Sequence, residues 1–376
     1  MAHFLLVQPF LDGYGGGERV CHNVIKTLLK QGQLVDLLTV NFDAQRYRII
    51  TGEEFPKQTS VHSLEKKVEI KPPFTIYKRH HVIVELLKTY RDCLKYDYVF
   101  CSQASSPFET IYLKNAKKYV GYVHFPEIHD DYQRSSVKKK AYLWLYKRWI
   151  EQGIAKFDLM FCNSFYTKEN IERYWKKYGA KEPAVVYPPV DLTSFWCKTP
   201  LSQRHKRITY VARFISRKRH EIMKQLATDF PQYEFVSIGG ATESDKEWVS
   251  NFTQALPQNY QVKTNLPQKE LIKTLQDSRI YTHLMVGEHF GIAPVEGLAS
   301  GCVPLVHDSG GMKEFIPNEY RWQTYAELKE KIARYMDASD AWENRRQELW
   351  EKIAELNPET FQENIWTNIK ASLYEQ

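Results

Sequence analysis

Two glutamates, Glu288 and Glu296, lie eight positions apart on either side of an apolar stretch that contains a glycine. The apolar residues 279–287 predict a buried strand entering a loop, and residues 294–300 predict the first turns of a helix. A strand–loop–helix unit directs backbone N–H groups and the positive end of a helix dipole at a bound phosphate. Carboxylates beside that phosphate would accept hydrogen bonds from sugar and ribose hydroxyls. The pattern predicts a nucleotide-sugar site, although two solvated glutamates beside an ordinary loop would look the same in isolation.

Positive charge follows the strand predicted at residues 207–212. Arg213 lies just past its end, and Lys218 lies five residues further on, near a predicted helix start. Such a pair would neutralise a leaving diphosphate, and arginine can bind it through two parallel hydrogen bonds. The alternative is a solvated basic loop, a role that suits Arg217 and Arg219 better.

A glycine-rich loop at residues 13–17 connects a predicted strand to a predicted helix. Gly16 and Gly17 allow a phosphate to approach the backbone closely. The dinucleotide fingerprint G-x-G-x-x-G fails, because Glu18 occupies the position of its last glycine. A tight turn without a ligand remains the alternative.

His124 ends a predicted strand at residues 119–124 and is followed by Phe-Pro. A histidine at the strand end would project into the site and bond a sugar hydroxyl, whereas a buried core histidine is the alternative. Seven other histidines show no such placement and are given no role in the site: His22, His80, His81, His129, His205, His220 and His283.

Residues 134–150 contain six basic residues, no acidic one, and interleaved tyrosines and tryptophans. A basic, aromatic helix suits a membrane surface with anionic headgroups, and residues 71–79 could extend the same patch. The alternative is a domain helix with a basic outer face and aromatic rings in the core. No nucleic-acid-binding motif accompanies the patch, so we expect no nucleic-acid partner.

Alternating strand and helix patterns position these motifs and predict an α/β protein with parallel sheets. We expect two Rossmann-like domains, at residues 1–190 and 207–355, whose sheets face across a cleft that holds the ligand. Residues 192–206 are irregular and polar. A last helix at 358–374, in the segment 356–376, could pack on either domain, including the N-terminal one.

The composition is that of a globular chain: 376 residues, 43% of them hydrophobic, with a net charge of +7. The six cysteines are scattered, which fits a reduced cytosol and excludes a C-x-x-C metal or redox motif. No run of about 18 apolar residues predicts a membrane span. The cysteines and the lack of such a run predict a cytoplasmic protein. Because no Asp-x-Asp occurs, we expect no metal clamp for a diphosphate.

These motifs, in this order, resemble the retaining glycosyltransferases of family 4, which have the two-domain GT-B fold. The E-x7-E pair, the Arg213/Lys218 pair and the glycine loop carry the resemblance. Residues 15–20, 122–126, 185–191 and 308–311 are similar to the family members that add α-1,2-mannose from GDP-mannose to the lipid-linked N-glycan precursor. We expect the chain to differ from these enzymes in being shorter and in having no membrane-spanning N-terminus.

The resemblance implies a role for each matching residue. Glu288 would bind hydroxyls of the donor sugar and Glu296 the ribose. Arg213 and Lys218 would stabilise the leaving diphosphate. The backbone N–H groups that would hold sugar and phosphate belong to Phe290, Gly291 and Ile292.

In the N-terminal domain, the resemblance implies that Gly16 and Gly17 admit the diphosphate and that His124 contacts the sugar near the reacting carbon. It implies a retaining, metal-independent transfer without a protein nucleophile or a cofactor. The expected donor is GDP-mannose, and the expected acceptor is a polyprenyl-linked or surface glycan. Peripheral contact with the cytoplasmic face of a membrane would occur through residues 134–150. Two rival hypotheses are a sugar-nucleotide epimerase or hydrolase, and an inactive nucleotide- or glycan-binding homologue.

Overall fold

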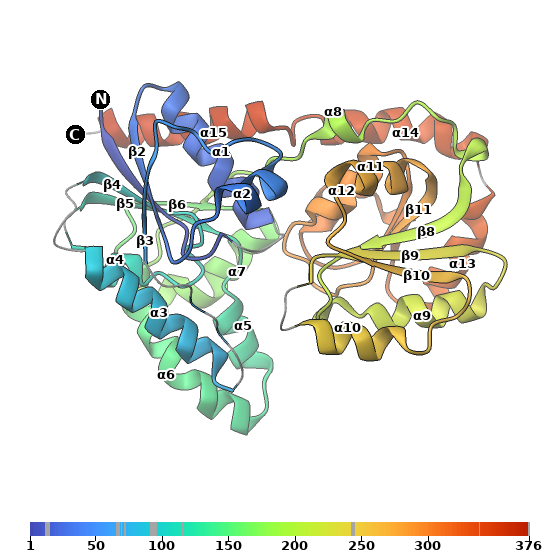
Figure 1. The fold of residues 1–376 in the computed structure, drawn as a ribbon, viewed down its shortest axis with the longest axis horizontal. Helices are drawn as coiled ribbons and strands as arrows, with labels where there is room; N and C mark the ends of the chain where they lie inside the picture. Colours follow the sequence, from blue (N-terminus) through green and yellow to red (C-terminus); the bar gives the residue numbers. More distant parts are fainter. Residues whose placement is uncertain are drawn as a thin grey trace. The chain divides into compact units, whose positions relative to one another are not determined.

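The computed structural model describes residues 1–11, 16–64, 68, 70, 73–90, 96–114, 116–241, 245–337 and 339–374. The chain forms two compact units. The first comprises Met1–Pro189 and Glu359–Gln376, and the second comprises Val190–Pro358. Each has its own parallel sheet with helices on both faces (Figure 1). The expectation of two Rossmann-like α/β domains is confirmed.

The sheet of the first unit has seven strands in the order β3-β2-β1-β4-β5-β6-β7. Their bounds are β1 His3–Val7, β2 Leu34–Thr39, β3 Ser60–Ser63, β4 Tyr96–Cys101, β5 Ala116–Val123, β6 Leu159–Cys162 and β7 Ala184–Val185. All neighbours pair in parallel, so their carboxyl ends share one edge. Strand β3 was not predicted, because its sequence Ser-Val-His-Ser is short and mostly polar.

Helices cover both faces of this sheet. They are α1 Gly16–Lys30, α2 Ala44–Thr51, α3 Thr75–Tyr90, α4 Glu109–Tyr112, α5 Glu127–Arg134, α6 Val137–Ile154, α7 Phe165–Trp175 and α15 Pro358–Tyr374. Alternate residues of β1 serve the two faces, since successive side chains of a strand point to opposite sides. Phe4 and Leu6 join the core under α1 and α15, whereas Leu5 and Val7 join the core under α3 and α6.

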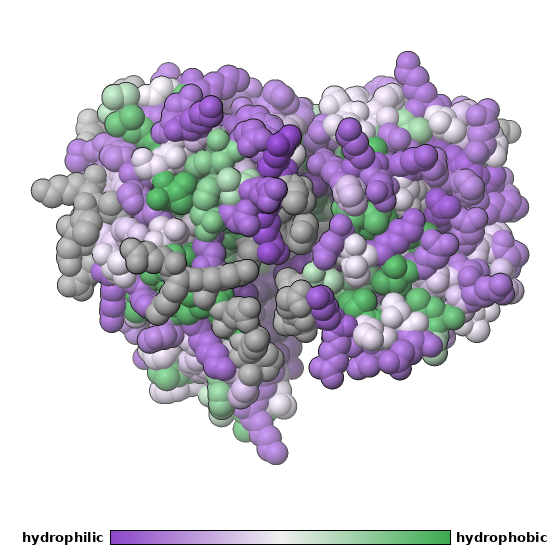
Figure 2. All heavy atoms as spheres, viewed as in Figure 1, coloured by the Kyte–Doolittle hydropathy of each residue, from purple (hydrophilic) through white to green (hydrophobic). Residues whose placement is uncertain are grey.

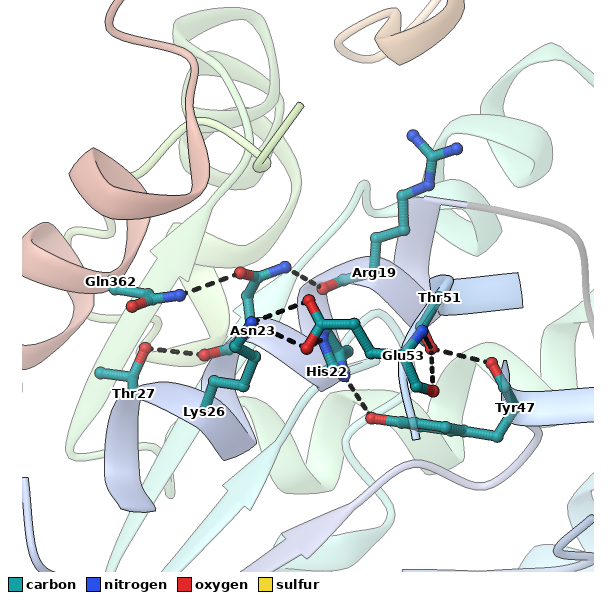
Figure 3. A network of polar contacts seen from close by, with 9 residues as sticks. All are labelled: Arg19, His22, Asn23, Lys26, Thr27, Tyr47, Thr51, Glu53 and Gln362. Carbon is teal, nitrogen blue, oxygen red and sulfur yellow. Dashed lines mark hydrogen bonds and ion pairs between the residues drawn. The ribbon is translucent and has the colours of Figure 1, made fainter. Parts of the chain in front are cut away.

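The last helix packs on the first unit. Phe361, Ile365 and Ile369 of α15 recur every four residues and are buried in the same core as β1 and α1. That spacing places them on one helix face. Gln362 also donates to Asn23 Oδ1 of α1 at 3.2 Å, within a polar network that continues to α2 (Figure 3).

The second unit has six parallel strands in the order β10-β9-β8-β11-β12-β13. Their bounds are β8 His205–Val211, β9 Glu234–Gly239, β10 Tyr260–Thr264, β11 Ser278–His283, β12 Val303–His307 and β13 Arg321–Trp322. Its α-helices are α8 Leu192–Phe195, α9 His220–Asp229, α10 Lys246–Thr253, α11 Gln268–Gln276, α12 Ile292–Ala299, α13 Tyr325–Met336 and α14 Ser339–Ile353. The segment 192–206 thus contains α8 and belongs to this unit.

Candidate functional site

The strand order of the second unit reverses between β8 and β11, which are neighbours in the sheet. Strands β9 and β10 follow β8 on one side, and β12 and β13 follow β11 on the other. In open α/β sheets, ligands bind outside the carboxyl ends of the strands at such a switch point. Arg213 and Lys218 follow β8, and Glu288 follows β11. Three of the predicted site residues therefore come from the two strands that flank this point.

Lys218 and Glu288 form an ion pair at the switch point. Lys218 Nζ lies 2.5 Å from Glu288 Oε2, and each side chain is only 14% exposed. Burial alone would raise the pKa of Glu288, but the Lys218 ammonium and a hydrogen bond from His283 bring it well below its ordinary value. Glu288 is therefore ionised at neutral pH and acts only as a hydrogen-bond acceptor.

His283 also belongs to this site, although the sequence analysis gave it no role. Its Nε2 lies 2.9 Å from Glu288 Oε2, and the side chain is buried. His283 is the last residue of β11. No sequence signal marked this position as a strand end, because the apolar stretch continues to residue 287.

The loop after β11 is shaped by contacts with the turn after β12. Gly287 N donates to Ser309 Oγ at 2.7 Å, and Gly311 N donates to Glu288 O at 2.8 Å. A Cβ on Gly310 would lie 2.1 Å from Glu288 O, so a larger residue would push the two segments apart. The glycines after Asp308 thus fix the backbone that carries Glu288.

Helix α12 begins where the sequence analysis placed the sugar- and phosphate-binding N–H groups. Gly291 precedes it with φ +100°, in the left-handed region that favours glycine. Phe290 is buried and packs on Phe315 at 5.3 Å between ring centroids. Ile292 is the first helical residue, and N–H groups of a first turn have no acceptor within their own helix.

Glu296 and Arg213 differ from the Lys218–Glu288 pair in their surroundings. Glu296 is buried on α12, with 3% of its surface exposed. Arg213 is exposed, and its guanidinium bonds none of the described residues. Its backbone carbonyl lies 3.1 Å from His220 Nε2, which ties the loop after β8 to α9. The structure therefore brings Lys218 to Glu288 but leaves Arg213 at the surface.

In the first unit, the strand order reverses between β1 and β4, and two further predicted residues, His124 and Gly17, lie close together. His124 follows β5, and its Nε2 lies 3.0 Å from Ser102 O. A Cβ on Gly17 would lie 3.6 Å from His124 Nε2 and 3.1 Å from Gln103 Nε2. Gly16 and Gly17 open helix α1. The earlier glycines of the loop, at 13 and 15, lie outside the described residues.

Comparisons with known proteins agree with the two-unit architecture. Residues 14–194 match the family model Glycosyltransferase Family 4, and residues 197–355 match the model Glycosyl transferases group 1. Sucrose-phosphate synthase from Thermosynechococcus elongatus superposes with a TM-score of 0.78 at 15% identity, and each chain is covered completely. TarM superposes with a TM-score of 0.71 at 13% identity, with 98% of each chain covered. The chain belongs to the glycosyltransferases with the GT-B fold, as the sequence predicted.

Three curated relatives share one printed name, GDP-Man:Man(3)GlcNAc(2)-PP-Dol alpha-1,2-mannosyltransferase. The Candida glabrata protein is 29% identical over 50% of this chain and 43% of its own length. The human protein is 31% identical over 42% of this chain and 35% of its own length. The Caenorhabditis elegans protein is 23% identical over 83% of this chain and 77% of its own length. The chain thus spans less than half of the Candida glabrata and human relatives.

Proposed function

We propose that this chain transfers mannose from GDP-mannose to a lipid-linked glycan at the cytoplasmic face of a membrane and forms an α-1,2 linkage. The observation that carries the proposal is the Lys218–Glu288 ion pair at the switch point of the second unit. It offers a cation for a diphosphate and a carboxylate for a sugar hydroxyl within one buried site. The donor, the acceptor and the linkage are those in the names of the relatives.

In the proposed reaction, the bond between the anomeric carbon and the diphosphate oxygen breaks as negative charge develops on that oxygen. The Lys218 ammonium would stabilise this charge, the kind of electrostatic effect that often dominates such catalysis. Exposed Arg213 would turn toward the same diphosphate. The acceptor hydroxyl attacks from the leaving-group side, and its proton passes to the departing phosphate oxygen. The configuration is retained without a protein nucleophile.

We propose that the transfer does not require a metal, because Lys218, Arg213 and the first turn of α12 supply positive charge at the diphosphate. The described residues contain no group of three His, Cys, Asp or Glu side chains that could hold a metal ion. The requirement for a metal is tested by measuring the transfer activity in EDTA. Activity that persists in EDTA supports the proposal, and activity that returns only when Mg²⁺ or Mn²⁺ is added would overturn it.

A lipid-linked acceptor requires access to a membrane, and the first unit has a suitable surface on α6. Three large hydrophobic side chains of α6 are exposed, Val137 by 84%, Trp144 by 54% and Leu145 by 41%, and so is Phe74 just before α3, by 60%. Exposed Lys138 and Lys139 accompany them, and we call these six residues the basic–apolar patch. In Figure 2, apolar and hydrophilic residues intermingle where Figure 1 places α3 and α6. The patch would contact anionic headgroups through its lysines and insert its apolar side chains.

Some aromatic side chains of α6 face the core and do not belong to this patch. Tyr146 is buried in the core, and Trp149 stacks on His80 at 4.5 Å between ring centroids. These two aromatic residues fit the alternative hypothesis of a core-facing side. Residues 71 and 72 of the extension predicted at 71–79 lie outside the described residues. None of the described helices is both long and apolar enough to cross a bilayer.

The donor is tested by calorimetry with GDP, UDP, ADP and their sugar conjugates in the presence of EDTA. We expect tight binding of GDP and GDP-mannose, followed by mannose transfer to a polyprenyl-diphosphate-linked oligosaccharide. A preference for UDP would keep the fold and discard GDP-mannose. Release of free mannose without an acceptor would favour a hydrolase instead.

A further inference from the structure

Tyr281 and His283 stand two residues apart on β11, so their side chains share one face of the strand. Tyr281 Oη lies 3.1 Å from His283 Nδ1, and His283 Nε2 lies 2.9 Å from Glu288 Oε2. All three side chains are buried or nearly so. They form a hydrogen-bonded row that ends on the carboxylate of the proposed donor site.

The protons in this row can have only one arrangement. An ionised carboxylate accepts and does not donate, so Nε2 of His283 must carry the proton toward Glu288. Burial lowers the pKa of His283, which keeps the ring neutral and makes Nδ1 an acceptor. Burial also raises the pKa of Tyr281 well above its ordinary value, so its hydroxyl keeps its proton and donates to Nδ1. The direction is therefore Tyr281 to His283 to Glu288.

The hydrogen bonds that Glu288 accepts leave one lone-pair site on its carboxylate for a further donor. Oε2 accepts from Lys218 Nζ at 2.5 Å and from His283 Nε2 at 2.9 Å. Oε1 accepts from the His289 backbone N–H at 3.1 Å. Each carboxylate oxygen offers about two lone-pair sites. Among the bonds that the described residues make, Oε2 is filled and Oε1 can take one more donor.

Gly297 explains how the row fits beneath α12. A Cβ on Gly297 would lie 2.5 to 2.8 Å from atoms of the Tyr281 side chain. Glycine inside a helix is less stable than alanine, so its presence calls for a packing reason. The reason here is that the Tyr281 ring lies directly against the helix backbone, next to Glu296.

Other ionisable side chains face His283 from neighbouring elements. Tyr210 of β8 has its ring 5.6 Å from the His283 ring, and its hydroxyl donates to Lys218 O at 2.6 Å. Lys218 lowers the pKa of His283, and so does its burial, while Glu288 raises it. His220 of α9 is itself kept neutral, because burial lowers its pKa to about 4. The surroundings of His283 therefore favour the neutral ring.

We propose that Tyr281 and His283 are positioning residues for the donor sugar: they turn the Glu288 carboxylate so that Oε1 accepts one sugar hydroxyl. The proposal rests on the proposed function only in taking a nucleotide sugar as the donor. The row acts through Glu288 and does not touch the diphosphate. It should therefore affect the part of the binding affinity that comes from the sugar.

The first test compares GDP with GDP-mannose by calorimetry in His283→Leu, His283→Gln and Tyr281→Phe. In His283→Leu we expect the affinity gained from the mannose to fall about tenfold, the size expected for one hydrogen bond to a charged group. GDP alone should bind within about twofold of wild type. His283→Gln, which keeps an N–H donor, should restore part of the loss, and Tyr281→Phe should show a smaller loss. Tyr260→Phe is the matched control, because it removes a buried hydroxyl that bonds Ser237 instead.

Equal losses for GDP and GDP-mannose, or no loss at all, would overturn the positioning role. The outcome for the proposed function is separate. If the wild type prefers UDP-glucose, GDP-mannose is the wrong donor, and the same variants are compared with UDP and UDP-glucose. Nitrogen-15 NMR of the imidazole tests the row without a ligand. We expect a neutral ring with the proton on Nε2 at pH 7, and a proton on Nδ1 would overturn the proposed direction.

Discussion

Two largely buried glutamates, one in each unit, show how partners decide the charge of the same residue type. Glu288 in the second unit is surrounded by Lys218, His283 and a backbone N–H, and its pKa lies well below its ordinary value despite burial. Glu109 in the first unit is also buried, and its Oε2 bonds no other group among the described residues. Burial raises its pKa to about 8, and the bond with Cys101 lowers it only partly. Glu288 is a charged binding group, whereas Glu109 is a neutral core residue at pH 7.

The strand-end histidines differ in a similar way. His283 of the second unit is buried and bonded on both sides by ionisable side chains, Tyr281 and Glu288. His124 of the first unit is less buried and bonds the backbone carbonyl of Ser102. Side chains hold His283 as part of a preformed site. The ring of His124 also lies 5.1 Å from the Tyr122 ring, measured between centroids.

The largest effect should come from breaking the charged pair in the second unit. Glu288→Ala and Lys218→Ala should each lower the transfer rate at least about 100-fold, because each removes a charge aimed at the diphosphate or the sugar. Rates are measured with radiolabelled GDP-mannose, and folding is checked by circular dichroism. Exposed Arg217→Ala is the control. Near-wild-type turnover in a folded Glu288→Ala protein would contradict the site assignment.

His124→Ala should lower kcat by about 10- to 100-fold, as expected for loss of one group near the reacting carbon. The affinity for GDP should stay unchanged, because Arg213 and Lys218, the charged side chains predicted to bind the diphosphate, lie in the second unit. Steady-state kinetics and calorimetry measure the two effects. His81→Ala, an exposed histidine on α3, serves as the control. A weaker affinity for GDP with unchanged kcat would assign His124 to donor binding instead.

The units also differ in exposed apolar side chains, since the basic–apolar patch lies wholly in the first unit. The double variant Trp144→Ser and Leu145→Ser should reduce co-sedimentation with anionic liposomes about threefold to tenfold, because less apolar surface enters the membrane. Changing Lys138, Lys139 and Lys140 to Glu should reduce it as well. Leu34→Ser removes a comparably exposed leucine on β2 and should change nothing. Absent or unchanged binding would reject the membrane contact.

The smallest effect on activity is expected from Glu109→Gln, which should leave transfer unchanged. Because the folded pKa of Glu109 is raised, its contribution to stability is present below its ordinary pKa of 4.5 and is lost as the pH rises through about 8. The variant should therefore gain stability relative to wild type between pH 6 and pH 9, by a few kcal/mol at most. Urea unfolding across this pH range measures the difference. For Glu288 the sign is reversed, because its contribution is lost as the pH falls below 4.5.

Much of the fold followed from local sequence patterns. The buried strands follow from short apolar runs. The start of α12 follows from the glycine before it and the proline in its first turn, which lie close together in the chain. Helix α12 begins near its predicted start, and helix α15 spans its predicted residues, for that reason. The end of β11 was misjudged: residues 284–287 are apolar but belong to the loop, because Leu284 and Met285 are buried without pairing in the sheet. Strand β3 was missed because it lacks an apolar pattern.

The sequence by itself determined the class of site: two carboxylates spaced across a loop and a helix start, with cations after an earlier strand. Only the tertiary structure decided which of these residues meet. Lys218 reaches Glu288 across 70 positions because β8 and β11 are paired in the middle of the sheet. Arg213, at the end of β8, stays exposed, whereas His283 bonds Glu288 only five positions further along the chain. Residue spacing specifies contacts within one strand or helix, whereas contacts between distant segments depend on the order in which the strands pair.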